Sequence, residues 1–208
     1  MADDNPWLRA APPQSPTAAL TVPAAPRGDQ DGDAALHAPP TTTGPKAPQP
    51  YIPPGPGPAL PRNPHPHSAP LWWLGVHGGA GETTLAHLSR NGQAAEHAWP
   101  IVKTEQPTVV LVARTHYHGL MRVRQAATEW ARGEVDARLL GLVFIASAPG
   151  RTPKPLREFA QLVAGAVPRV WRIPWVEAWQ IAPADIQTAP RSLRRMLVDT
   201  ESLISPTS

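Results

Sequence analysis

The sequence predicts an α/β fold, with a small, mainly parallel sheet of about four strands covered by helices. After residue 70, four short runs of almost continuous apolar residues lie along the chain, and a segment with helical spacing separates each run from the next. Strands without apolar–polar alternation are typical of parallel sheets, which are buried on both faces. Parallel neighbours also need crossover connections, and the helical segments supply them.

The first predicted strand, 71–76, reads LWWLGV and leads directly into a glycine-rich loop. A short helix is expected after the loop, because Leu85 and Leu88 share one face of a helix. The Asn91-Gly92 pair is a turn signal that ends this helix. The chain therefore passes from a strand through a glycine loop into a helix.

Further strands are predicted over 108–114, 139–146 and 169–174. The first of these is rich in β-branched residues, and a helix that ends at Gly133 connects it to the second. Another helix follows the loop SAPGRTPKP, and Pro174 ends the last strand. If all crossovers step the same way, their helices cover one face of the sheet. The other face is then left for the C-terminal helix, the proline-rich arm or a partner.

A last helix is expected over 191–203. Its apolar side is formed by Leu193, Met196, Leu197, Thr200, Leu203 and Ile204. We expect this side to pack on the sheet. A second reading places the segment 191–204 on a membrane surface or a nucleic acid through its arginines, which are Arg191, Arg194 and Arg195.

The first third of the chain has a different composition. About two thirds of the 29 prolines precede Leu71, and aliphatic runs are almost absent there. Such a segment buries too little apolar surface to offset the entropy of ordering its backbone. The sequence therefore predicts a disordered, proline-rich arm over 1–69 and a folded domain over 70–208.

Composition excludes several classes of protein. The chain has no cysteine, so disulfides, thiolate catalysis and cysteine-ligated zinc are excluded. No segment resembles a signal peptide or reaches the length of a membrane span, so a cytoplasmic location is expected. The net charge of +3 and the pI of 9.8 come from dispersed arginines, which is not typical of a specific nucleic-acid surface.

The loop after the first strand carries a resemblance to a known family. With its flanking strand and helix, and with the later runs VVLVAR, LLGLVFIASAPG and VWRIPW, it resembles the ParA/MinD-like branch of the P-loop ATPases over 71–179. That family's loop, K-G-G-x-G-K-[ST]-[ST], aligns without gaps on His77, Gly78, Gly79, Ala80, Gly81, Glu82, Thr83 and Thr84. The resemblance implies a P-loop NTPase-like fold with its ligand site at this loop.

The departures from that pattern decide the expected function. His77 and Glu82 replace both lysines, and the second of these lysines neutralises phosphate oxygens in the family. About twenty residues separate Ser89 from Thr108, and no aspartate occurs between Asp33 and Asp136 to organise magnesium. Catalysis is therefore not expected, and neither is a cofactor.

The glycines still form an anion-attracting nest at a helix start. Glu82 lies in the first turn of the helix, where its charge interacts favourably with the helix dipole. We therefore expect the Glu82 carboxylate to occupy the niche that a phosphate would take.

These observations favour a non-catalytic pseudo-ATPase that acts as an adaptor through protein contacts. Trp175, Trp179 or the proline-rich arm would supply the contacts. The alternative is a working nucleotide-binding protein, binding ATP or another phosphate ligand, in which His77, Arg114, Arg151 or a partner's residue replaces the missing lysines.

Other candidate groups lead to weaker expectations. His116 and His118 follow the second predicted strand, where they could join His77 in a three-imidazole metal site. Histidines two residues apart in a loop are more often solvated, so no metal site is predicted. Ser89 and Ser147 lack the sequence context of a hydrolase nucleophile.

Overall fold

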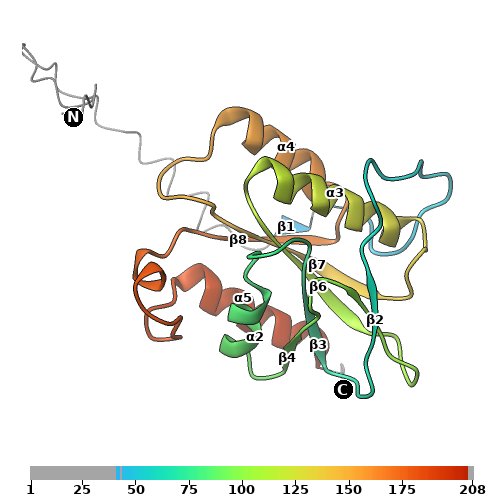
Figure 1. Ribbon diagram of the computed structural model, residues 1–208, viewed down its shortest axis with the longest axis horizontal. Coiled ribbons are helices and arrows are strands. Elements are labelled where there is room, and N and C mark those ends of the chain that lie inside the picture. Colours follow the sequence, from blue (N-terminus) through green and yellow to red (C-terminus); the bar gives the residue numbers. More distant parts are fainter. Residues whose placement is uncertain (1–40, 43, 206–208) are drawn as a thin grey trace, which may run out of the picture.

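The computed structural model of the protein describes residues 41–42 and 44–205, and Figure 1 shows their arrangement. The described residues form an α/β fold around one six-stranded sheet. The prediction of disorder over 1–40 concerns residues outside the described part.

The central strands match the predicted ones closely. The sheet has the order β1-β8-β7-β6-β3-β4, in which all neighbours are parallel except β1 and β8. The strand bounds are Thr41–Thr42 (β1), Leu71–Gly75 (β3), Gly92–Ala94 (β4), Thr108–Arg114 (β6), Arg138–Ile145 (β7) and Arg169–Ile173 (β8). The prediction of a mainly parallel sheet is confirmed, and the short edge strands β1 and β4 are additions to it.

The direction of the chain across the sheet reverses between β3 and β6. From β3 the chain passes through α2 (Glu82–Leu88) to β4 on one side, and it later continues from β6 to β7 and β8 on the other side. Because parallel crossovers are right-handed, opposite steps place their helices on opposite faces. Accordingly α3 (Tyr117–Ala131) and α4 (Lys154–Ala164) cover one face, while α2 lies on the other (Figure 1).

The C-terminal helix α5 (Arg191–Ile204) completes the second face beside α2 (Figure 1). Its residues Leu193, Met196 and Leu197 are buried against strand residues such as Val110 and Val143. The apolar side of α5 therefore packs on the protein's own sheet, as expected.

The prediction of disorder is wrong for the part of the proline-rich segment that the structure describes. Residues 62–64 form strand β2 (Arg62–Pro64), which pairs in parallel with β5 (Trp99–Ile101) in a separate two-stranded sheet. Leu60 is buried with 3% of its surface exposed, and Ala69 is also buried. This part of the chain lies along α3 and is part of the fold (Figure 1).

Side chains of α3 explain why this segment is ordered. The Gly57 N–H donates to Oε1 of Gln125 at 3.0 Å, and the Leu60 N–H donates to Oε1 of the buried Glu129 at 3.0 Å. A count of aliphatic side chains overlooks these backbone donors, which lie between the prolines. The segment is held by hydrogen bonds as well as by apolar burial.

No helix in the described part of the chain combines the length and the apolar character needed to cross a membrane.

Candidate functional site

The candidate site lies at the carboxyl ends of β3 and β6, where the strand order reverses. In open α/β sheets this reversal leaves a crevice at which ligands bind. The loop after β3 supplies His77 and the glycines, and the loop after β6 supplies Arg114, His116 and His118. The fold thus brings together residues that are separated by almost forty positions in the sequence.

The glycine loop is open to solvent on its outer side. Gly78 and Gly79 are exposed, and a Cβ atom added at either position would meet nothing within 4 Å. Gly79 and Gly81 have φ angles of 71° and 107°, which favour glycine. Gly81 is the N-cap of α2, and no side chain of Thr83 or Thr84 caps the helix.

Glu82 points away from the glycines, contrary to the expected self-liganded loop. Its side chain is buried, with 3% of the residue exposed. Oε2 accepts a hydrogen bond from the Gly75 N–H at 2.5 Å, and Oε1 lies 3.0 Å from Nδ1 of His97. The carboxylate therefore ties the start of α2 to β3 and to the loop after β4, and it does not bind the amides of the glycine loop.

The turn at His97 depends on this carboxylate. Glu96 and His97 both have positive φ angles, 56° and 60°, which are strained for residues other than glycine. The His97 N–H also faces Oε2 of Glu82 at 3.4 Å, and His97 Nδ1 lies 3.0 Å from the Gly75 carbonyl oxygen. Contacts with Glu82 and Gly75 thus hold the turn in place.

The ring of His77 joins the ends of two strands. Nε2 accepts a hydrogen bond from the Arg114 N–H at 3.1 Å, so Nδ1 carries the proton and donates to the Gly78 carbonyl at 2.8 Å. Burial lowers the pKa of His77 below its ordinary value of 6.5. The hydrogen bond to Gly78 opposes this shift, and the nearby His116 and His118 rings add to it.

Two further histidines gather beside His77. The ring centroids of His77 and His116 are 4.8 Å apart, and His118 lies 6.2 Å from His77 and 6.3 Å from His116. His116 is the N-cap of α3, and its Nδ1 accepts from the Gly119 N–H at 2.9 Å. Burial lowers the pKa of His116, and the charges of His118 and Arg114 lower it further.

The histidine pKa values predict a loss of stability in acid. His77 and His116 are harder to protonate in the folded protein than in the unfolded chain, where the pKa is near 6.5. The unfolded state therefore binds more protons as the pH falls below about 6.5, and the free energy of unfolding decreases. The slope is at most about 1.4 kcal/mol per pH unit for each proton. Urea unfolding between pH 8 and pH 5.5 measures it.

The variant His116→Asn measures how much His116 contributes to this pH dependence. Asparagine keeps a side-chain acceptor at the N-cap but does not titrate. We expect this variant to lose less stability than the wild type between pH 7 and pH 5.5. An equal loss in both proteins would show that His116 does not contribute to the pH dependence.

Several ring nitrogens of these histidines are used by the backbone. Both ring nitrogens of His77 are bonded to the backbone, and Nδ1 of His116 is used at the helix cap. Among the described residues, no group of three metal-binding side chains is placed to hold an ion. The three imidazoles considered from the sequence come together in space, but the backbone uses both nitrogens of His77 and Nδ1 of His116.

The remaining candidate residues lie outside this cluster or have structural contacts. Arg151 is exposed in the loop between β7 and α4, and no bond joins it to the glycine loop in the described part of the chain. The Ser89 hydroxyl accepts from Trp73 Nε1 at 3.0 Å. Trp175 and Trp179 are partly buried, and their Nε1 groups donate to Glu177 at 2.8 Å and to Thr188 at 2.9 Å.

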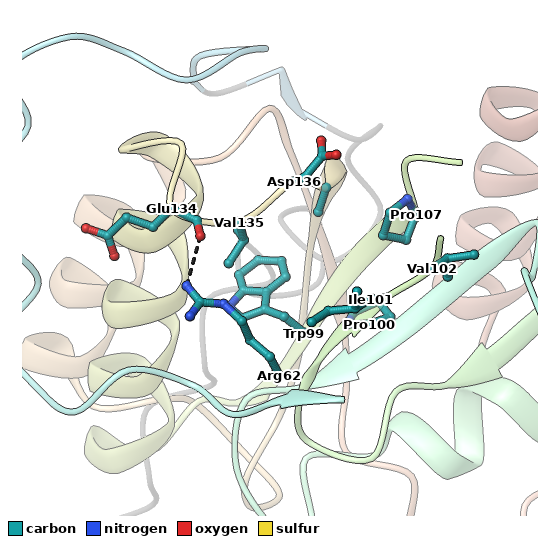
Figure 2. Close-up of a pocket in the computed structure, with 10 residues that line it drawn as sticks. Arg62, Trp99, Pro100, Ile101, Val102, Pro107, Glu134, Val135 and Asp136 are labelled. Carbon is teal, nitrogen blue, oxygen red and sulfur yellow. Dashed lines mark hydrogen bonds between the residues drawn. The ribbon is translucent and has the colours of Figure 1, made fainter. Parts of the chain in front are cut away.

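A hollow of about 230 Å³ lies near the amino ends of β6 and β7, away from the glycine loop. Figure 2 shows Arg62 beside it, where Nη2 donates to the Glu134 carbonyl at 2.8 Å. The lining residues are Arg62, Trp99, Pro100, Ile101, Val102, Pro107, Glu134, Val135, Asp136 and Ala137. The hollow lies between β5 and the segment before β7. The sequence gave no sign of this hollow, because β2 and β5 were not predicted.

Sequence reasoning also missed His97, the partner of Glu82. Its signal in the sequence is weak, since a single histidine in a polar loop is usually solvated. Only the pairing of β3 with β4 brings the loop after β4 beside the start of α2.

Comparison with known proteins gives one match. A protein family described as "Family of unknown function (DUF6668)" matches residues 69–197. No curated protein and no solved structure gave a match to the chain. The matched range runs from the residues before β3 into α5, so it includes the glycine loop and the three histidines His77, His116 and His118.

Proposed function

The chain belongs to the DUF6668 family of unknown function, and from this premise we propose a non-catalytic relative of the ParA/MinD-like P-loop ATPases that acts through protein contacts. The observation that carries the proposal is the orientation of Glu82. At the position of the phosphate-binding lysine of the ParA/MinD-like loop, this chain has a carboxylate. That carboxylate is buried in contact with Gly75 and His97. In place of a lysine that would neutralise a triphosphate, the loop therefore has a glutamate whose carboxylate forms structural hydrogen bonds.

The alternative, a working nucleotide-binding protein, has less support. Of the residues that would replace the lysines, His77 has both ring nitrogens bonded to the backbone. Arg151 is exposed in its own loop. Arg114 lies beside the glycine loop, but Nη1 and Nε are directed to the carbonyls of Ala146 and Gly79. A single arginine with these contacts is a poor match for the charge of a triphosphate.

The segment after β8 offers the contact surface. Ile181 is 90% exposed and directly follows the 3₁₀-helix Glu177–Gln180, which carries the partly buried Trp179. Trp175 precedes the same helix and is also partly buried. An exposed isoleucine that is close in sequence to two tryptophans is suited to an interface anchor, because large apolar and aromatic side chains contribute much of the energy of interfaces.

This proposal predicts protein contacts that do not depend on ATP. Affinity capture from the native host with the full chain should retain the same proteins with and without ATP and magnesium. The variant Ile181→Glu should lose them, since a carboxylate at the centre of an apolar contact costs desolvation energy. Ile181 is almost fully exposed, so the substitution should leave the melting temperature unchanged.

Two results would overturn the proposal. One is an equal set of captured proteins for the wild type and Ile181→Glu. The other is micromolar binding of ATP and magnesium by the purified protein in isothermal titration. The variant Glu158→Lys, which changes an exposed side chain on α4, serves as the control for a surface charge change.

A further inference from the structure

A cluster of hydrogen-bond donors without a counter-charge lies at the carboxyl edge of β6. It consists of Arg114, His116 and His118, which we call the donor cluster. Arg114 and His116 are partly buried, and His118 is exposed. Among the residues that the structure describes, no carboxylate forms an ion pair with any of them.

The hydrogen bonds of the cluster fix which atoms face outward as donors. Nδ1 of His116 accepts from the Gly119 N–H, so the proton of the neutral ring is on Nε2. Arg114 uses Nη1 for the Ala146 carbonyl and Nε for the Gly79 carbonyl, and no bond of Nη2 is found in the described part of the chain. Each of these two side chains thus keeps a donor that no protein group uses.

His77 organises the cluster without belonging to it. Its Nε2 accepts from the Arg114 N–H, which fixes the backbone at the end of β6. Its ring lies 4.8 Å from that of His116 and 6.2 Å from that of His118. The donors are therefore held on a rigid strand end and helix start.

The surroundings favour negative charge. The cluster lies at the N-terminus of α3, a fifteen-residue helix whose dipole places partial positive charge there. The neighbouring loop leaves room, since added Cβ atoms at Gly78 and Gly79 would meet nothing within 4 Å. The carboxylate of Glu82 binds Gly75 and His97 and not the cluster.

We propose that the donor cluster binds a small oxyanion of the phosphate or sulfate class. A compact tetrahedral anion accepts several hydrogen bonds at once, and here one arginine and two imidazoles lie close together. This site goes beyond the proposed function, because it requires neither a nucleotide nor the lysines that the glycine loop lacks.

The test titrates the full chain with sodium phosphate and with sodium sulfate by isothermal calorimetry, at constant ionic strength maintained with sodium chloride. We expect saturable binding by the wild type. Arg114→Gln should weaken it at least tenfold, because a charge-assisted bond is lost. His116→Asn, which keeps the cap acceptor, and His118→Ala, at an exposed position, should each weaken it several-fold. Arg194→Gln, an exposed arginine on α5, should leave it unchanged.

Nuclear magnetic resonance supplies a readout that does not depend on the fold of Arg114→Gln. The imidazole signals of His116 and His118 should shift with phosphate and saturate, while that of the exposed His87 should not. Absence of saturable binding by the wild type would overturn the proposal. It would also be overturned if His116→Asn and His118→Ala both bound the anion as tightly as the wild type does. Binding of ATP with magnesium through the same residues would instead overturn the proposed function and leave the anion site supported.

Discussion

Replacing Glu129 by alanine is expected to lower the free energy of unfolding by about 3 to 5 kcal/mol. The carboxylate is 1% exposed and accepts three hydrogen bonds. Its donors are the Leu60 N–H at 3.0 Å, Trp99 Nε1 at 2.9 Å and Gln125 Nε2 at 2.8 Å. Alanine would leave all three donors buried without an acceptor. Urea unfolding measures the loss, and hydrogen exchange at the Leu60 amide should show that the proline-rich segment detaches.

Two variants separate this network from a general effect of losing a glutamate. Glu158→Ala removes an exposed carboxylate 3.7 Å from Lys154, and it should cost at most about 0.5 kcal/mol. Glu129→Gln keeps one acceptor oxygen but turns an NH₂ group toward a donor, so its loss should be intermediate. If Glu129→Ala were as stable as the wild type, the network would not hold the segment.

Replacing Glu82 by lysine should destabilise the protein by about 3 kcal/mol or more without creating ATP binding. The substitution introduces the lysine of the ParA/MinD-like loop that the sequence resembles, but the side chain it replaces is buried against the Gly75 N–H and His97. An ammonium group there would face a backbone donor, and the strained turn at Glu96 and His97 would lose its partner. Thermal unfolding and calorimetric titration with ATP and magnesium measure the two effects.

The exposed His87 on the same helix provides the matched control. His87→Lys adds a lysine to the last turn of α2, where a positive charge interacts favourably with the helix dipole. We expect its stability to stay within about 0.5 kcal/mol of the wild type. A stable Glu82→Lys protein that binds ATP at micromolar concentration would show that the carboxylate excludes nucleotide and has no structural role.

The four central strands could be predicted because each is a buried run with its own signal in the sequence. The predicted range 108–114 matches β6 at both ends. The predicted β3 and β8 are one residue too long, and the predicted β7 is shifted by one residue. The edge strands β1 and β4 and the pair β2 and β5 have only two or three residues each, which is too short for any periodic pattern. They form because neighbouring strands offer free backbone groups, which the local sequence does not reveal.

The position of the candidate site was also predictable, but its chemistry was only partly so. The glycines and His77 lie at the carboxyl end of β3, where the loop was expected. The direction of the Glu82 side chain was not predictable, because two sets of partners could bind its carboxylate. One set is the amides of the glycine loop, and the other is Gly75 and His97. His97 is fifteen residues away in the sequence, and the parallel pairing of β3 with β4 brings it within 3.0 Å.

The sequence by itself determined the α/β class, the helices between the main parallel strands and a glycine loop, 77–84, that contains no lysine. These features depend on apolar spacing and on residue identity, which are local. The tertiary structure decided that Glu82 turns inward, that the three histidines gather at the carboxyl ends of β3 and β6 and that Glu129 holds the proline-rich segment. Each of these depends on a hydrogen bond or ring contact between residues far apart in the chain, and such partners are chosen only when the sheet and helices have packed.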